Sequence, residues 1–125
     1  RSPTQYQAMT QLAGCFIALG RPEQAESPLN EALMINQDHA PAWFQRGLLY
    51  LDWGKEEAAI SDLVTATKVD PNHLDAHLHL AAIHHESERF DQASDAWRAA
   101  LAIDGEHTVA KKRLEESESA ILASI

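Results

Sequence analysis

Small and apolar residues recur along this chain at a spacing of 34 residues, and this spacing orders the predicted elements. The tracks that carry it are Ala25, Ala59 and Ala93; Ala32, Ala66 and Ala100; Leu29, Leu63 and Trp97; Leu12, Arg46 and Leu80; and Ile35, Val69 and Ile103. A fixed period of this length is typical of stacked copies of one supersecondary unit, none of which buries its apolar face alone. The pattern therefore predicts a repeat protein.

Each copy of the pattern predicts two antiparallel helices joined by a short turn. In the second copy the helices span 40–53 and 56–69, Gly54 forms the turn, and Asp70-Pro71-Asn72 ends the pair because proline cannot continue a helix. The third copy predicts helices over 74–87 and 90–103, and the first predicts 6–19 and 22–35 with a break at Gly20. Apolar residues at helical spacing give every helix one buried face.

Pro28 breaks the pattern inside the second helix of the first copy. Proline removes a backbone donor and clashes with the preceding turn, so it kinks a helix interior. Because Leu29, Ala32, Leu33 and Ile35 still form an apolar face after it, we expect a bend at Pro28 rather than the loss of the helix.

Residues 108–125 predict one further amphipathic helix. Leu114, Ile121 and Ile125 fall on one side of it, and charged residues occupy most of the rest. The end of a stacked array needs such an element, with one apolar stripe and a polar outer face. The sequence thus predicts an all-α fold in a single domain over 1–125, with repeats at 6–39, 40–73 and 74–107 and a capping helix at 108–125.

Charge excludes some classes of partner. The 125 residues carry 19 acidic and 10 basic side chains, a formal net charge of −9. This balance argues against nucleic acid and against an anionic membrane surface. No apolar stretch approaches the ~20 residues of a membrane-spanning helix, so we expect no membrane insertion.

Cys15 is the only cysteine, which excludes an internal disulfide and a thiolate zinc cluster. We expect it to be a small buried hydrophobe. A lone cysteine is compatible with the cytosol and favours it only weakly, so the compartment stays open. The chain opens at Arg1-Ser2-Pro3 without methionine, and we expect it to be a segment of a longer protein.

The repeated residues resemble the tetratricopeptide repeat family. The second copy carries the family residues Trp43, Gly47, Tyr50, Gly54, Ala59, Ala66 and Pro71. The third keeps Leu80, Ala81, Ala93, Trp97 and Ala100 but has His77 and His84 where Trp and Tyr are usual, and the first retains Leu12, Phe16, Gly20, Ala25 and Ala32. The resemblance implies a right-handed α-solenoid of three antiparallel helix pairs with a C-terminal capping helix.

The same resemblance implies a function in binding peptides or proteins, in a concave groove lined by the first helix of each pair. The candidate partner-binding residues are Phe44, Gln45, Leu48, Leu51, Asp52, Asp75, Leu78, His79, His85 and Glu86. Phe44, Leu48, Leu51 and Leu78 are large apolar groups that packing inside the array does not need, and exposed apolar patches mark binding surfaces. The alternative is that the capping helix or a neighbouring repeat covers them.

The charges of the groove favour one kind of partner. Asp52, Asp75 and Glu86 form an acidic rim, so we expect an apolar or amphipathic partner segment with basic residues. Some members of the family bind a chaperone's C-terminal carboxylate with basic side chains. The corresponding positions here are Thr10, Gly14, Gln45, Asp75 and His79, which offer no basic pair. We therefore expect no carboxylate clamp.

Five of the seven histidines, His73, His77, His79, His84 and His85, fall within thirteen residues. A metal site needs imidazoles that converge on one ion, and no cysteine or convergent carboxylate completes a set here. We expect packed or solvated histidines and no metal site. A pH-sensitive packing around His77 and His84 is a further hypothesis.

The sequence shows no catalytic motif: it has no nucleophile elbow and no glycine-rich phosphate loop. We expect no enzyme activity and no cofactor. Two alternatives to a partner-binding scaffold stay open. The first is a homo-oligomer that pairs through the same apolar surface or through Ile121, Leu122 and Ile125. The second is a non-catalytic docking segment of a larger enzyme.

Overall fold

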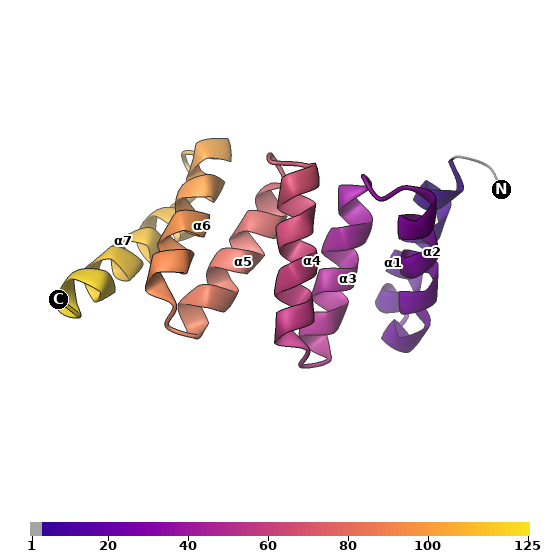
Figure 1. Ribbon diagram of the computed structural model, residues 1–125, viewed down its shortest axis with the longest axis horizontal. Coiled ribbons are helices and arrows are strands. Elements are labelled where there is room, and N and C mark those ends of the chain that lie inside the picture. The colour runs from indigo at the N-terminus through magenta and orange to yellow at the C-terminus, as the bar shows by residue number, and fades with distance from the viewer. Residues whose placement is uncertain (1–3) are drawn as a thin grey trace. The chain divides into compact units, whose positions relative to one another are not determined.

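The computed structural model describes residues 4–125, so the expectation attached to Arg1, Ser2 and Pro3 lies outside the described residues. Within that range the chain forms seven α-helices and one short 3-10 helix, and no strand. The elements are α1 (Gln5–Ala18), η1 (Pro22–Gln24), α2 (Glu26–Ile35), α3 (Ala40–Asp52), α4 (Glu56–Val69), α5 (Leu74–Glu86), α6 (Phe90–Ile103) and α7 (Thr108–Ala123) (Figure 1). The all-α prediction is confirmed.

The chain divides into two compact units, the first ending at Pro71 and the second running from Asn72 to Ile125. In the first unit α1 packs against α2, α3 packs against α4, and α2 also contacts α3. In the second unit α5 packs against α6, and α6 packs against α7. Consecutive helices within each pair run in opposite directions (Figure 1). No helix in residues 4–125 is both long and apolar enough to cross a membrane.

The alanine tracks lie at the contacts between helices. All six alanines of the two tracks have no exposed surface, and Leu29, Leu63 and Trp97 are at most 3% exposed. Alanine lets two helices approach closely because its side chain ends at Cβ, and tight packing leaves no room for a larger group. The 34-residue period therefore marks the buried face of the second helix in each pair.

Left-handed residues make the turns inside the helix pairs. Gly20 has a φ of 75° and Gly54 a φ of 74°, a region that glycine enters without steric penalty. The residue after each glycine donates its backbone N–H to a carbonyl five positions back, Arg21 to Phe16 at 2.8 Å and Lys55 to Tyr50 at 2.8 Å. This pattern closes the last helical turn.

Pro28 does not bend a helix, so that expectation is wrong. The predicted helix over 22–35 consists of η1 and a separate α2 that begins at Glu26. Pro28 is the third residue of α2 and is buried there. The first N–H groups of any helix have no partner within it, so proline loses no hydrogen bond at this place. The chain restarts the helix rather than bending it.

Two expectations about burial are also wrong. Cys15 is exposed, because α1 packs on η1, α2 and α3 and Cys15 faces away from these elements. Ile125 is 95% exposed, because α7 ends at Ala123 and no longer carries the predicted stripe to the last residue. The buried face of α7 instead consists of Ala110 and Ser117, with Leu114 packed against the core of the second unit.

A polar cluster joins α2, α3 and α4 in the first unit. Arg46 donates two hydrogen bonds to the buried carboxylate of Asp62, from Nε at 2.8 Å and from Nη2 at 2.9 Å, and a third to Asn30 at 2.9 Å. The hydrogen bond to Asp62 raises the pKa of Arg46, while burial acts in the opposite direction. Tyr50 donates to Glu26 at 2.6 Å, and burial together with this bond raises the pKa of Tyr50 to about 12.

Candidate functional site: clefts on the first helix of each pair

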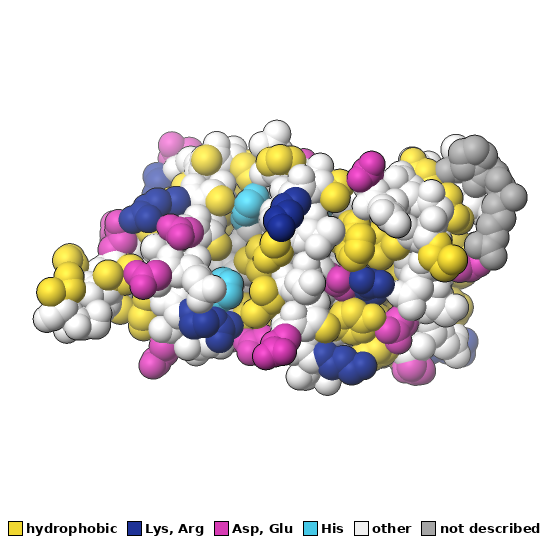
Figure 2. Space-filling view, viewed as in Figure 1, with side chains coloured by type: hydrophobic (Ala, Val, Ile, Leu, Met, Phe, Trp, Pro, Cys, Tyr) yellow, Lys and Arg dark blue, Asp and Glu magenta, His cyan; other side chains and the backbone are white. Residues whose placement is uncertain are grey.

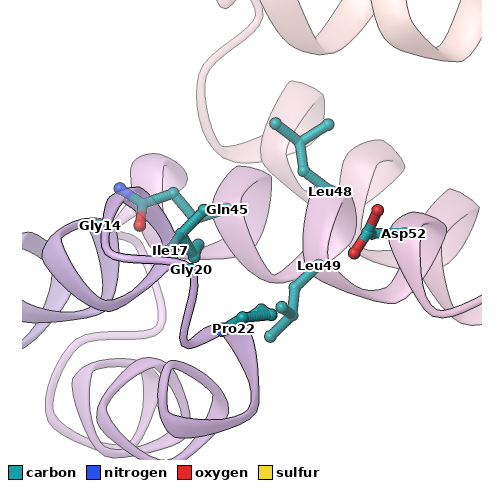
Figure 3. Close-up of a pocket in the computed structure, with 8 residues that line it drawn as sticks. All are labelled: Gly14, Ile17, Gly20, Pro22, Gln45, Leu48, Leu49 and Asp52. Carbon is teal, nitrogen blue, oxygen red and sulfur yellow. The ribbon is translucent and has the colours of Figure 1, made fainter.

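A cleft of about 550 Å³ opens between α1 and α3 in the first unit. Its lining residues are Gly14, Ile17, Gly20, Pro22, Gln45, Leu48, Leu49 and Asp52 (Figure 3). The four residues from α3 are spaced at intervals of three, one and three, so they share one face of that helix. The helical period alone thus brings Gln45, Leu48 and Asp52 to the cleft.

The cleft has apolar walls and polar ends. Ile17 from α1, Pro22 from η1 and Leu48 from α3 supply aliphatic surface, and Ile17 is 40% exposed. Gln45 lies beside Gly14, and Asp52 lies at the C-terminal end of α3 (Figure 3). Such a combination, apolar surface with a few polar groups, is typical of ligand sites.

Two polar side chains of the cleft, those of Gln45 and Asp52, have an oxygen without a hydrogen-bond or ion-pair partner in residues 4–125. The amide oxygen Oε1 of Gln45 is buried and accepts no hydrogen bond from the described part of the protein. Asp52 is exposed, and its carboxylate forms no ion pair with any residue in 4–125. A buried acceptor without a partner is destabilising, whereas water solvates the exposed carboxylate of Asp52. The unpaired oxygen of Gln45 is therefore the stronger indication of a binding site.

Gly14 and Gly47 lie in neighbouring helices but in different surroundings. A Cβ on Gly47 would stand 3.0 Å from Cγ of Leu63 and 3.3 Å from the carbonyl oxygen of Ala59, so α3 and α4 need glycine to pack. A Cβ on Gly14 would meet only Oε1 of Gln45, at 3.8 Å. Packing therefore explains Gly47 and leaves Gly14 unexplained.

The second unit has two smaller adjoining clefts between α5 and α7. One, of about 280 Å³, is lined by Leu78, His79, Ala82, Trp97, His107 and Val109. The other, of about 230 Å³, is lined by Ala82, His85, Glu86, Trp97, Val109 and Arg113. Trp97 is 3% exposed, and its indole nitrogen has no hydrogen-bond partner within residues 4–125.

The histidines on α5 are held by neighbours rather than converging. His79 donates from Nδ1 to the carbonyl oxygen of Asp75 at 2.8 Å. His85 contacts α7, with Nδ1 3.1 Å from Oγ of Ser117 and Nε2 3.8 Å from the Glu116 carboxylate. Its ring also packs edge-on against Phe90 and Trp97. Within residues 4–125 no three histidine, cysteine or carboxylate groups gather in a way that could hold a metal ion.

The expected binding residues fall into two sets, one in each unit. In the first unit Gln45, Leu48 and Asp52 line the cleft, while Phe44 and Leu51 are half-buried beside it on α3. In the second unit Leu78, His79, His85 and Glu86 line the two smaller clefts, and Asp75 is exposed in the first turn of α5.

Sequence reasoning missed lining residues outside the first helix of each pair. Val109 and Arg113 come from α7 and lie 34 positions after Asp75 and His79. Extending the repeat register past residue 107 could have found both. Pro22 and Trp97 carried no such signal, because their positions in the register belong to the second helix of a pair.

A histidine register was also missed. His39, His73 and His107 are 34 residues apart and occupy the N-cap positions of α3, α5 and α7. The rings of His73 and His107 each accept a backbone N–H through Nδ1 at 3.2 Å, from Ala76 and Ala110. His39 instead packs on Tyr6, with ring centroids 4.8 Å apart, and burial lowers the pKa of His39. These histidines therefore have structural roles.

Comparison with family models and with known sequences shows which proteins this chain is similar to. A model described as tetratricopeptide repeat matches residues 6–39 and 40–73. DnaJ homolog subfamily C member 3 from Homo sapiens is 27% identical over 103 residues, which are 82% of this chain and 19% of that protein. The Mus musculus protein of that name matches equally. The chain thus spans about a fifth of the length of the curated relatives it matches.

Solved structures share the fold at lower identity. One is described as the first TPR of Spaghetti (RPAP3) bound to HSP90 peptide SRMEEVD; it has a TM-score of 0.83 at 13% identity, covering 98% of this chain and 99% of that one. The Arabidopsis OM64 TPR domain has a TM-score of 0.79 at 19% identity, covering 91% of this chain and 94% of that one. At these identities the similarity speaks to the fold alone, which is TPR-like and all-α.

Proposed function

Because this chain belongs to the tetratricopeptide repeat family, we propose that it is a protein-interaction module. It binds a peptide or helical segment of a partner protein on the first helix of each pair. The observation that carries this proposal is the cleft of about 550 Å³ between α1 and α3, whose apolar walls are open to solvent. The proposed binding residues are Phe44, Gln45, Leu48, Leu51, Asp52, Asp75, Leu78, His79, His85 and Glu86.

The partner segment is apolar or amphipathic and carries basic residues. Leu48 and Leu78 face a cleft in their respective units and offer aliphatic contact. Asp52, Asp75 and Glu86 are exposed carboxylates on the same helices. Opposite charges at the rim of an interface fix register and speed association more than they add affinity.

A chaperone-type carboxylate clamp does not fit this surface. The similar RPAP3 domain is described in complex with HSP90 peptide SRMEEVD, which is acidic and ends in a carboxylate. The clamp positions of this chain hold Thr10, Gly14, Gln45, Asp75 and His79. No lysine or arginine stands among them to meet a carboxylate, and Asp75 repels one. We therefore propose that SRMEEVD does not bind here.

The module works by binding and not by catalysis. The cleft of the first unit presents aliphatic walls, an amide and one carboxylate, and the clefts of the second unit add histidines, Glu86 and Arg113 but no serine or cysteine to the lining. Ser94 is buried and donates to the carbonyl oxygen of Asp91 at 3.1 Å. Any activity of a longer protein that contains this segment resides in its other parts.

The experiment that tests the proposal first selects peptides that bind the protein and then measures their binding to variants with substitutions in the clefts. A random peptide library displayed on phage is selected against the immobilised protein, and the enriched peptide is synthesised for fluorescence anisotropy. Leu48→Glu or Leu78→Glu should weaken its binding at least tenfold, since each places a charge on the apolar contact. The control is Met34→Glu, because Met34 is 82% exposed on α2.

Equal affinity in Leu48→Glu, Leu78→Glu and Met34→Glu would overturn the proposal. Titration with the peptide SRMEEVD is the second arm. Saturable binding of SRMEEVD that disappears when its C-terminus is amidated would contradict the claim that the clamp is absent.

A second candidate function is homo-oligomerisation. Leu122 is 70% exposed and Ile125 is 95% exposed at the end of α7, and hydrophobic atoms lie at the surface next to the C-terminus (Figure 2). Sedimentation velocity over a range of concentrations tests this candidate. A single monomeric species at all concentrations removes it, and a dimer abolished by Leu122→Glu supports it.

A further inference from the structure

We propose that Gly14 keeps open a slot in the first unit for one bulky apolar side chain of an extended partner segment, with a basic residue of that segment two positions later paired with Asp52. This inference rests on the proposed binding function and names the partner more closely. It uses the cleft between α1 and α3, and it depends on three residues: Gly14, Gln45 and Asp52.

The first step is that no packing contact requires glycine at position 14. It lies in the interior of α1, where glycine is less favourable than alanine by roughly 0.5–1 kcal/mol. Gly47 carries the same penalty but is needed, because a Cβ there would meet Leu63 at 3.0 Å. Gly14 has an ordinary helical φ, and its nearest neighbour would be 3.8 Å from an added Cβ. The missing side chain leaves space only in the cleft.

The register supports this assignment. Leu48 and Ala82 lie 34 and 68 positions after Gly14, and each of the three lines a cleft in its own unit. The cleft beside Gly14 has about twice the volume of either cleft at Ala82, about 550 Å³ against about 280 Å³ and 230 Å³. Of these three clefts, the one beside Gly14 has a volume in the range of roughly 300–1,000 Å³ that is typical of ligand pockets, and it adjoins a further cleft of about 430 Å³ that Gln45 also lines.

The second step is that Gln45 selects an extended segment. Its buried Oε1 accepts no hydrogen bond from residues 4–125, and its side chain lines both this cleft and the neighbouring one at Gln7, Thr10, Gln11, His39 and Pro41. A primary amide offers an acceptor and two donors, which matches the N–H and C=O of a peptide unit. In a helical partner these groups are already bonded to each other. An extended segment leaves them free for the Gln45 amide, which turns toward the cleft on binding because its Oε1 is buried in the free protein.

The third step places the basic residue. Asp52 stands seven positions after Gln45 on the same face of α3, two helical turns along the cleft. Its carboxylate has no ion-pair partner in residues 4–125. In an extended segment, side chains two positions apart point the same way. An apolar side chain in the slot thus directs the side chain two positions later to the same wall of the cleft, where a lysine or arginine meets Asp52.

The test uses a defined peptide and a substitution that fills the slot. The probe is the N-acetylated, C-amidated peptide Gly-Ser-Leu-Ser-Lys-Ser-Gly, titrated into the ¹⁵N-labelled protein and followed in ¹H–¹⁵N correlation spectra. The amide signals of Gly14, Gln45 and Asp52 should shift with one dissociation constant. Replacing the leucine of the probe by alanine should weaken binding about tenfold, and replacing its lysine by glutamate about threefold or more.

The decisive variant is Gly14→Leu. It fills the slot while favouring the helix, so its melting temperature should equal or exceed that of the unaltered protein, and binding of the probe should fall at least tenfold. The matched control is Ala8→Leu, an equal addition at an exposed position of α1 that lines none of these clefts.

Each outcome decides the inference. A loss of binding in Gly14→Leu with no loss in Ala8→Leu supports it. Unchanged binding in Gly14→Leu, or probe-induced shifts located away from the cleft or absent, overturns the slot. In those cases the proposed function still stands or falls separately, by the effect of Leu48→Glu and Leu78→Glu on the library-selected peptide.

Discussion

The helix pairs α3–α4 and α5–α6 occupy the same places in the 34-residue register but hold their helices together with different chemistry. In the first unit Arg46 on α3 and Asp62 on α4 form a bidentate ion pair with N···O distances of 2.8 and 2.9 Å. In the second unit the residues 34 positions later are Leu80 and Ala96, both of which are apolar. Leu80 is 6% exposed and Ala96 packs against the core there.

This difference shows which features of the repeat are required. Alanines at the helix contacts occur in both units, so close approach of the helices is common to them. The two positions of the register that hold Arg46 and Asp62 in the first unit hold the apolar residues Leu80 and Ala96 in the second, so the fold accepts either an ionic or an apolar pair there. An ion pair in this place fixes geometry but adds little stability over a packed apolar pair, because both groups lose water.

The largest expected effect comes from breaking the ion pair on one side. Asp62→Ala leaves the guanidinium of Arg46, whose side chain is 20% exposed, without its carboxylate. We expect a loss of about 3 kcal/mol in the free energy of unfolding, measured by urea denaturation followed by circular dichroism. The double variant Arg46→Leu, Asp62→Ala copies the second unit and should recover most of that loss. A double variant no more stable than Asp62→Ala would show that the two units are not interchangeable at these positions.

The next effect concerns the spacing of α3 and α4. Gly47→Val puts a branched side chain against Leu63 and should cost about 1–3 kcal/mol through overpacking. Gly14→Val is the matched control in α1, and it should change stability by less than about 0.5 kcal/mol because the site is open. Thermal melts of the two variants test the contrast. Equal melting temperatures would contradict the account of both glycines.

A smaller effect distinguishes the turns within the helix pairs. Gly54 and Glu88 are 34 residues apart, with φ values of 74° and 59°. Glutamate in the left-handed region costs roughly 1–2 kcal/mol, whereas glycine adopts it freely. Glu88→Gly should therefore raise stability by up to about 1 kcal/mol, since part of the gain is lost to the greater freedom of glycine in the unfolded chain. Gly54→Glu should lower stability by a similar amount. Denaturation midpoints measure both changes, and a shift in the same direction for the two variants would contradict this expectation.

The smallest effect is a pH dependence at the start of α3. Burial lowers the pKa of His39 below its usual 6.5, so the folded chain favours the neutral ring. The stability associated with His39 is therefore complete above the unfolded pKa and is lost as the pH falls through the folded pKa. His39→Asn keeps a good N-cap residue without a titrating group. Melting temperatures at about pH 7.5 and about pH 5.5 should differ less in this variant than in the unaltered protein. An equal difference in both would assign the pH dependence to other groups.

Most of the fold could be predicted from the sequence because the pattern that marks each helix pair occurs in three copies. The helices α4 and α6 have the expected bounds of Glu56–Val69 and Phe90–Ile103. The bounds of α1, α3, α5 and α7 differ from the expected ones by one or two residues, and α2 begins four residues later than expected. The expected bend at Pro28 failed because the 3-10 turn at Pro22–Gln24 moves the helix start to Glu26. A proline in the first turn and a proline in the interior look alike in sequence when the start is unknown.

The candidate site was less predictable than the fold. Helical spacing on α3 placed Gln45, Leu48 and Asp52 on one face, and all three line the cleft. The other wall depends on where the chain turns after α1, which brings Pro22 and Gly20 to the cleft. Such contacts depend on how helices meet, which a pattern along one helix does not contain.

We propose that a partner segment occupies the cleft between α1 and α3. The most direct measurement is a ¹H–¹⁵N titration of the protein with the peptide selected from the random library. We expect the largest shifts on amides of the lining residues, Gly14, Ile17, Gln45, Leu48 and Asp52, and no change at Met34 and its neighbours on α2. Shifts concentrated on α2 and α4, with the cleft amides unmoved, would contradict it.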